Sequence, residues 1–256
     1  MIHPSAIVSP DARISPDAEV GPFAVIGEQV EIGPRCWIGP NVVINGQTRI
    51  GADNKIYQFA SIGANPQDKK YGGGATRLEI GDRNVFREFC TINRGATPEH
   101  GLTRIGNDNL FMAYTHVAHD CTLGNNIVMV NYAGLAGHVD LGDWVILSGY
   151  TGVHQFCKIG AHAFTAALSG VTRDVPPYIM AVGQPAVPHS INSEGLKRRG
   201  FTPEQIRNLR NAYRILYRSD QPLSAAVEQL SALLPAQPEL KPLVEFIAAS
   251  ERSLIR

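Results

Sequence analysis

Residues 20–44, VGPFAVIGEQVEIGPRCWIGPNVVI, repeat one six-residue pattern four times. A β-branched aliphatic residue returns at every sixth position, as at Val20 and Ile26, and a small residue such as Ala24 comes four positions after it. Side chains alternate between the two faces of a strand, so the small residue and the aliphatic residue two positions later point to the same side. Each repeat therefore predicts a short strand with two inward side chains, followed by a turn in which we expect glycine to supply a positive φ.

The same period extends over most of the chain. From Ile2 to Ile62 every sixth residue is a β-branched aliphatic, the pattern returns at Ile80, and from Ile105 onward it continues with Thr165 as the one polar member. Three strands close a coil of about 18 residues, and stacked coils bury one another's apolar side chains. The sequence therefore predicts a mainly β fold, a parallel β-helix of hexapeptide repeats over residues 1–190, interrupted by loops near 64–77 and 97–104.

The four cysteines all occupy the small inward position of a repeat: Cys36, Cys90, Cys121 and Cys157. A buried cysteine without a partner behaves as a small hydrophobic residue. Their placement predicts buried free thiols rather than disulfides or zinc ligands.

The six-residue period stops near residue 172, and helical patterns follow. Thr202 and Gln205 form a capping box around Pro203, which predicts a helix over 202–219. Apolar residues at helical spacing predict two more helices over 223–234 and 239–255. We therefore expect residues 191–256 to form a C-terminal α-helical domain.

The overall charge excludes some partners. Twenty-three basic side chains balance 23 acidic ones, so no global field favours nucleic acid or an anionic membrane. We expect no transmembrane segment and no signal peptide, and therefore a cytoplasmic protein. A local basic face stands out on the helix predicted over 202–219, at Arg207, Arg210, Arg214 and Arg218. A solvated face is one interpretation, and a docking surface for an acidic protein is the one we favour.

The stretch HVAHDC, residues 116–121, lies within the repeats. Residues 18 apart fall on neighbouring coils, which groups His119 with Gly137 and Gln155, and Asp120 with His138. Such a group offers a base, a carboxylate to orient it and donors for an oxyanion. A zinc site like that of gamma-class carbonic anhydrases and a non-catalytic scaffold are the alternatives, and we expect no metal. His116 and His154 fall nearby, whereas the remaining histidines are expected at the surface: His3, His100, His162 and His189.

The hexads together with HVAHDC, AGHV (136–139), VHQFC (153–157), IGAHAF (159–164), DVPPY (174–178) and EGLKRRGF (194–201) resemble one family over nearly the whole chain. This is the acyl-acyl carrier protein–UDP-N-acetylglucosamine O-acyltransferase family, which opens lipid A synthesis in the cytoplasm of Gram-negative bacteria. The resemblance implies a left-handed β-helix, a homotrimer with active sites between subunits, and no cofactor apart from the 4′-phosphopantetheine that the carrier protein brings. A coenzyme A-dependent acetyltransferase of the same fold is a further alternative.

The resemblance also implies roles for individual residues. His119 would be the general base that accepts the proton of the glucosamine 3-hydroxyl, Asp120 would orient its imidazole, and the Gly137 N–H would bind the oxyanion. The residues expected to bind the substrates are Asp68, Lys70, His116, His138, Gln155, Asn192, Glu194, Arg198 and Arg199.

Two further positions bear on specificity. The family usually has TIHRG where this chain has TINRG, residues 91–95, so Asn93 replaces a histidine near the acceptor. Because some members acylate a 3-amino sugar nucleotide, Asn93 leaves amide formation open beside the ester that we expect. Ala167 and Leu168 fall where relatives measure the length of the acyl chain.

Overall fold

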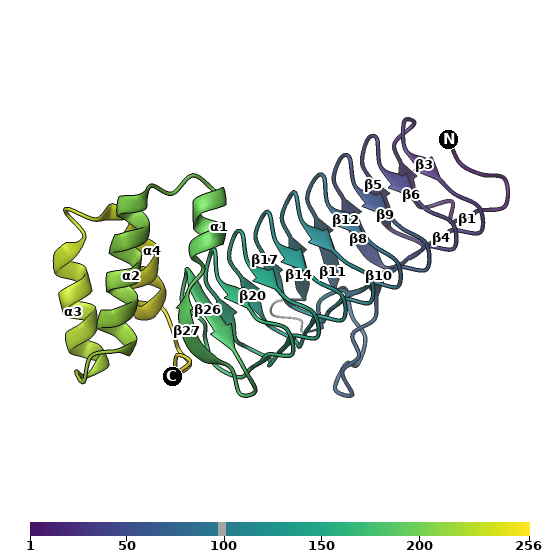
Figure 1. Ribbon diagram of the computed structural model, residues 1–256. Coiled ribbons are helices and arrows are strands. Elements are labelled where there is room, and N and C mark those ends of the chain that lie inside the picture. Colours follow the sequence, from purple (N-terminus) through teal and green to yellow (C-terminus); the bar gives the residue numbers. More distant parts are fainter. Residues whose placement is uncertain (97–100) are drawn as a thin grey trace.

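The computed structural model describes residues 1–96 and 101–256. It is a left-handed parallel β-helix followed by a group of helices, as the sequence and the resemblance predicted. Successive short strands pass to three parallel sheets in turn, which form the sides of a long prism (Figure 1). The core is the column of inward aliphatic side chains inside this prism.

The strands of the three sides are short, and most contain two residues. Side 1 contains β1 (Ile7–Val8), β4 (Val25–Ile26), β7 (Val43–Ile44), β10 (Ser61–Ala64), β13 (Thr91–Asn93), β16 (His116–Val117), β19 (Gly134–Leu135), β22 (Gly152–Val153) and β25 (Gly170–Val171). Side 2 contains β2 (Arg13–Ile14), β5 (Val30–Ile32), β8 (Gln47–Ile50), β11 (Arg77–Ile80), β14 (Leu102–Ile105), β17 (Thr122–Leu123), β20 (Asp140–Leu141) and β23 (Lys158–Ile159). Side 3 contains β3 (Glu19–Val20), β6 (Trp37–Ile38), β9 (Lys55–Ile56), β12 (Val85–Phe86), β15 (Leu110–Phe111), β18 (Val128–Met129), β21 (Ile146–Leu147), β24 (Phe164–Thr165), β26 (Ile179–Val182) and β27 (Val187–Ile191).

The register of the strands follows the six-residue period. Ile26 pairs with Ile44, so one coil takes 18 residues. Both side chains are buried, as is Ala24 at the small position of its repeat. The inward pair predicted for each repeat is therefore confirmed.

The corners differ from the prediction in one respect. The positive φ lies three residues after the aliphatic position, at residues such as Phe23 and Asn41, and not at the glycine that follows the aliphatic residue. That glycine is needed for close packing between coils, because a Cβ on Gly33 would lie 2.4 Å from the carbonyl oxygen of Gly51. The expectation that glycine turns the corner was wrong, since other residues adopt the left-handed conformation there.

Each corner of the prism carries its own column of side chains. Between sides 3 and 1 a stack of exposed rings, here called the aromatic column, has centroids 4.7–5.1 Å apart: Phe59, Phe89, Tyr114, Tyr132 and Tyr150. Between sides 2 and 3, Arg35 pairs with Asp53 and Arg83 pairs with Asp108. The third corner, between sides 1 and 2, contains Asp120 and is called the site corner below.

Two excursions interrupt the coils, and both leave the helix at the site corner. The first connects β10 to β11 and is seen projecting below the prism in Figure 1. It lengthens one coil to 30 residues, because Ser61 pairs with Thr91. The second connects β13 to β14 and includes residues 97–100, which lie outside the described residues together with the predicted surface position of His100.

The C-terminal part begins after an antiparallel pair, β26 and β27. Its helices are α1 (Ser193–Arg198), α2 (Pro203–Tyr217), α3 (Leu223–Leu233), η1 (Pro238–Leu240) and α4 (Lys241–Ala248). The predicted capping box at the start of α2 is confirmed. The helix expected over 239–255 was wrong beyond Ala248, because the last residues pack back on the β-helix, where the Ile255 N–H donates to the Asp174 carbonyl. The division at residue 190 into two domains stays a prediction.

The four cysteines are buried and free, as expected. Burial raises the pKa of each thiol, to about 12 at Cys121 and about 11 at Cys157. Among residues 1–96 and 101–256, no helix is long and apolar enough to cross a membrane.

Candidate active site

His119 and Asp120 form a dyad at the site corner, after β16 and before β17. His119 Nδ1 lies 2.8 Å from Asp120 Oδ2, and the Asp120 side chain is only 1% exposed. A carboxylate can only accept hydrogen bonds, so in the neutral imidazole this contact places the proton on Nδ1 and leaves a lone pair on Nε2. The dyad thus has the arrangement of a base and the group that orients it.

Other groups hold the side chain and the backbone of Asp120 in place. The Ala96 backbone N–H donates to Oδ2 at 3.0 Å, and the Asp120 N–H donates to Thr103 Oγ1 at 2.9 Å. The second oxygen, Oδ1, is buried and has no hydrogen-bond partner among residues 1–96 and 101–256. Asp120 also adopts the left-handed conformation of the corner, with φ 57°.

Gly137 lies directly beneath the imidazole of His119, one coil further on. A Cβ at this position would lie 2.5 Å from His119 Cε1 and 2.7 Å from Nε2, so only glycine leaves room for the ring. The Gly137 N–H donates to no acceptor within the described part of the chain. It is therefore available to a ligand at the dyad.

His138 completes the cluster that the 18-residue spacing predicted. Its ring packs edge-on against His119, with centroids 5.2 Å apart, and Nε2 lies 3.8 Å from Asp120 Oδ2. Three ligand atoms of His119, Asp120 and His138 lie within 4.8 Å of one another, a spacing that a metal ion also tolerates. The expected absence of a metal stays a prediction.

The first excursion, residues 64–77, brings Asp68 to the dyad. Asp68 Oδ2 lies 4.0 Å from His119 Nε2, and its Oδ1 accepts the Lys70 backbone N–H at 2.9 Å. The Lys70 side chain is exposed. We call residues 64–77 the acceptor loop, after the role that the resemblance implies for it.

His116 and Asn93 lie on side 1 beside this group. The His116 Nδ1 and Thr91 Oγ1 atoms are hydrogen-bonded at 2.7 Å, and burial, with His119 nearby, lowers the pKa of His116. Asn93 is buried, and its Nδ2 donates to the Asn65 carbonyl at 3.1 Å, while its Oδ1 has no hydrogen-bond partner in the described part of the chain. Asn93 is therefore attached to the start of the acceptor loop.

Gln155 occupies the next coil at the site corner. Its carbonyl accepts from the Arg252 guanidinium, so the C-terminal residues reach the candidate site. A cavity of about 730 Å³ beside it is lined by Asp120, His138, Phe156 and Arg252, among others.

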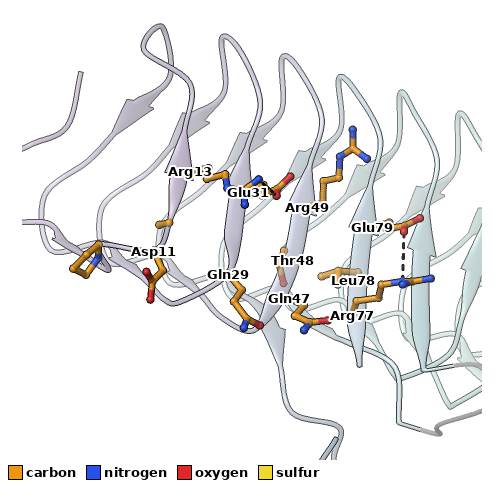
Figure 2. A pocket seen from close by; sticks show the side chains of 12 residues that line it. Asp11, Arg13, Gln29, Glu31, Gln47, Thr48, Arg49, Arg77, Leu78 and Glu79 are labelled. Atoms are coloured by element: carbon orange, nitrogen blue, oxygen red, sulfur yellow. Dashed lines mark hydrogen bonds and ion pairs between the residues drawn. The ribbon is translucent and has the colours of Figure 1, made fainter. Parts of the chain in front are cut away.

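A second hollow, of about 700 Å³, lies on side 2 far toward the N-terminal end (Figure 2). Its charged side chains alternate along the sheet, as in the ion pairs of Arg13 with Glu31 and of Arg77 with Glu79. None of the predicted site residues lines it. We therefore place the candidate site at the dyad.

The predicted nucleotide-binding residues lie at α1, away from the dyad. Asn192 caps α1 by accepting the Gly195 N–H, and it also donates to the His162 carbonyl. Glu194 and Arg198 are exposed, whereas Arg199 lies over the Trp144 ring, 5.0 Å from its centroid. In the described chain, no hydrogen bond or ion pair joins these four residues to His119 or Asp120.

Sequence reasoning placed His162 at the surface, which was wrong. Its ring is half-buried between Trp144 and Tyr178, and the Arg199 guanidinium lies 3.1 Å from its Nδ1. Burial and the charge of Arg199 lower the pKa of His162 to about 4. The repeat shows that residue 162 lies at a corner of the β-helix. It does not show that α1 and the residues after it cover this corner. His3 and His189 are exposed, as expected.

The remaining candidates lie elsewhere on the surface. Ala167 and Leu168 are exposed, and Leu168 continues the corner of the aromatic column rather than the site corner. A single chain therefore does not bring them to the dyad. The three basic residues of α2, Arg207, Arg210 and Arg214, are exposed, as is Arg218 just past the end of the helix.

Comparison with known proteins agrees with this picture. Residues 174–255 match the profile of the second domain of UDP-N-acetylglucosamine O-acyltransferases, and residues 29–64 match the bacterial transferase hexapeptide. A relative from Janthinobacterium sp. (strain Marseille) is 57% identical over 209 residues, 80% of each chain. One from Thiobacillus denitrificans is 53% identical over 203 residues, 79% of each chain. Both are named acyl-[acyl-carrier-protein]–UDP-N-acetylglucosamine O-acyltransferase.

Solved structures with this fold cover the whole chain. The UDP-N-acetylglucosamine O-acyltransferase of Moraxella catarrhalis has a TM-score of 0.98 at 44% identity and is itself covered to 99%. The UDP-N-acetylglucosamine acyltransferase of Francisella novicida has a TM-score of 0.97 at 43% identity and is covered to 94%. The chain therefore belongs to the family of acyl-[acyl-carrier-protein]–UDP-N-acetylglucosamine O-acyltransferases.

Proposed function

We propose that this protein transfers an (R)-3-hydroxyacyl group from acyl carrier protein to the 3-hydroxyl of UDP-N-acetylglucosamine, the first step of lipid A synthesis. The observation that carries the proposal is the His119–Asp120 dyad over the bare backbone of Gly137, in a chain of this family. The reaction needs no cofactor besides the phosphopantetheine of the donor. Its place would be the cytoplasm of a Gram-negative bacterium, where the carrier protein and UDP-sugars occur.

The proposed chemistry follows from the geometry of the dyad. His119 Nε2 accepts the proton of the 3-hydroxyl while the sugar oxygen attacks the thioester carbon, and Asp120 stabilises the imidazolium through Nδ1–H. The carbonyl oxygen becomes an oxyanion that the free Gly137 N–H binds. When the tetrahedral intermediate collapses, the C–S bond breaks, and the proton on His119 passes to the leaving thiolate.

The acceptor would lie between the dyad and the acceptor loop. Asp68 faces His119 Nε2, and we assign Lys70, His116, His138 and Gln155 to the sugar and its surroundings. The uridine and phosphates would extend to Asn192, Glu194, Arg198 and Arg199. The side-chain oxygen of Asn192 already accepts the Gly195 N–H at the start of α1. The backbone beside Asn192, rather than its side-chain amide, would therefore contact the nucleotide.

A homotrimer would complete the site. The aromatic column exposes five stacked rings, an apolar surface that a second copy of the chain would cover. Ala167 and Leu168 lie on the same corner, so the acyl chain would reach them from the dyad of a neighbouring subunit. The acidic carrier protein would dock on Arg207, Arg210, Arg214 and Arg218, whose charges are exposed.

Mass spectrometry of the products tests the proposed function. The protein would be given 3-hydroxyacyl carrier proteins of several chain lengths, with UDP-N-acetylglucosamine and its 3-amino analogue. A single esterified UDP-sugar, absent with His119→Ala, is the expected result and also gives the acyl length. An amide product alone would instead connect Asn93 with an amine acceptor, and no acylated nucleotide at all would refute the proposal.

A further inference from the structure

Arg94 holds the acceptor loop at three points. Nη1 donates to the Gly63 carbonyl at 3.0 Å, Nε to Thr76 Oγ1 at 3.3 Å, and Nη2 to the Tyr71 hydroxyl at 3.4 Å. Gly63 lies in β10 just before the loop, Thr76 lies just before β11, and Tyr71 lies between them. One guanidinium therefore joins both ends of the loop and its middle.

The surroundings of Arg94 are shaped for this side chain. A Cβ on Gly46 would lie 2.5 Å from Arg94 Nη1, so a side chain at residue 46 would displace the guanidinium from this place. A hydrogen bond from Thr76, with the charge of Arg94 nearby, lowers the pKa of Tyr71. A planar guanidinium can serve three acceptors in fixed directions, which the single ammonium group of lysine cannot.

The two residues that follow connect the same segment to the dyad. A Cβ on Gly95 would lie 2.0 Å from the backbone of Gly101, so the beginning and the end of the second excursion are packed tightly together. The Ala96 N–H then donates to Asp120 Oδ2 at 3.0 Å. The path from the acceptor loop to the carboxylate of the dyad thus runs through three consecutive residues.

We propose that Arg94 is a positioning residue for the acyl acceptor, which keeps the acceptor loop closed so that Asp68 faces His119 Nε2. It would touch no substrate, and its effect would pass through the loop. The proposal rests on the proposed role of Asp68 in binding the acceptor.

Steady-state kinetics of Arg94→Met and Arg94→Lys test the proposal, with Arg13→Met as the matched control. Arg13 is an exposed arginine with one ion pair, in the first strand of side 2 near the N-terminal end of the β-helix. Displacing the loop by about 1 Å is expected to raise the KM for UDP-N-acetylglucosamine in Arg94→Met on the order of 10- to 100-fold. The KM for the acyl carrier protein should stay unchanged, Arg94→Lys should recover part of the loss, and Arg13→Met should match the wild type.

Limited proteolysis measures how accessible the acceptor loop is to a protease, without relying on enzyme activity. Trypsin can cleave after Lys69 and Lys70, and Arg94→Met should speed this cleavage whereas Arg13→Met should not. The double variant Tyr71→Phe, Thr76→Val removes two of the three hydrogen-bond acceptors and keeps Arg94. It serves if Arg94→Met does not fold, and it should also speed cleavage and raise the KM for UDP-N-acetylglucosamine.

The outcomes separate the positioning role of Arg94 from the proposed role of the acceptor loop in binding the acceptor. Faster cleavage with a raised acceptor KM supports the positioning role, and wild-type cleavage overturns it. Faster cleavage with unchanged acceptor kinetics also overturns it. If Asp68→Ala then leaves the same KM unchanged, the proposed role of the loop in acceptor binding has failed as well.

Discussion

Replacing Asp120 with asparagine removes one charge from the dyad and changes almost nothing in its size. The imidazolium that forms during proton transfer would then lose its buried counter-charge. His119 and Asp120 side chains are 14% and 1% exposed, so solvent screens this pair little. At charge centres about 4 Å apart and an effective dielectric constant near 20, the attraction is about 4 kcal/mol. This corresponds to roughly a 1000-fold loss of kcat.

The hydrogen bonds of Asp120 also predict that Asp120→Asn lowers activity. If the amide oxygen takes the place of Oδ2, it still accepts from His119 and Ala96, but the NH₂ group is left in the buried place of Oδ1. If the NH₂ group faces His119 instead, it forces the proton onto Nε2 and removes the base. Either orientation lowers activity, and the second abolishes it.

The assay is the rate of ester formation at saturating concentrations of both substrates, with the thermal unfolding midpoint measured on the same samples. Asp108→Asn is the matched control, because Asp108 pairs with Arg83 on another corner. A folded Asp120→Asn protein that keeps kcat within tenfold of the wild type would refute the assignment of Asp120 as the partner of a general base.

Four further outcomes are expected. Gly137→Ala should lower kcat on the order of 100-fold or more, because its Cβ would lie 2.5 Å from His119, whereas Gly134→Ala, with its nearest neighbour at 4.0 Å, should keep activity. Tyr132→Glu should lower the molar mass measured by light scattering to that of a single chain, and an unchanged mass would exclude the aromatic column as the subunit contact. A thiol reagent at pH 8 should modify no cysteine of the native protein and all four after denaturation, because burial raises the pKa of each thiol. The temperature of the unfolding midpoint should fall as the pH falls from about 6.5 toward 4. In this range His162 binds a proton in the unfolded state but not in the native state, where its pKa is lowered to about 4. His162→Phe should weaken this pH dependence.

The six-residue period predicted the β-helix because one residue type at one spacing controls both burial and register. The pairing of Ile26 with Ile44 could be read directly from it. The same spacing grouped Asp120 with His138, because a corner residue returns at the same corner one coil later. Even the two excursions carry a signal, since the period breaks after Ile62 and after Ile92. Both breaks lie at the corner that His119 occupies, two coils after Ile62 and one coil after Ile92.

What the period could not predict depends on contacts between segments far apart in the chain. His162 was assigned to the surface because nothing in its own repeat indicates that Arg199 and Tyr178 would pack against it. The last residues look helical by their apolar spacing, yet Ser250 hydrogen-bonds Asp174 in the last coil. Arg94 follows a recognisable repeat, but its three acceptors lie 18 to 31 residues away, two of them within a loop that has no period and one just before it.

The placement of both excursions at one corner has a consequence for how such enzymes diversify. A coil pairs only with the coils before and after it. The register shifts between Ile62 and Ala64, where the acceptor loop begins, but β11 then pairs with β8 without a shift from Arg77 to Ile80. Residues can therefore be gained or lost in the acceptor loop during evolution without moving a strand, while the dyad stays on its own coil. If the acceptor loop binds the acceptor as proposed, the substrate range of this scaffold can change through this loop alone, while the strands of the prism stay the same.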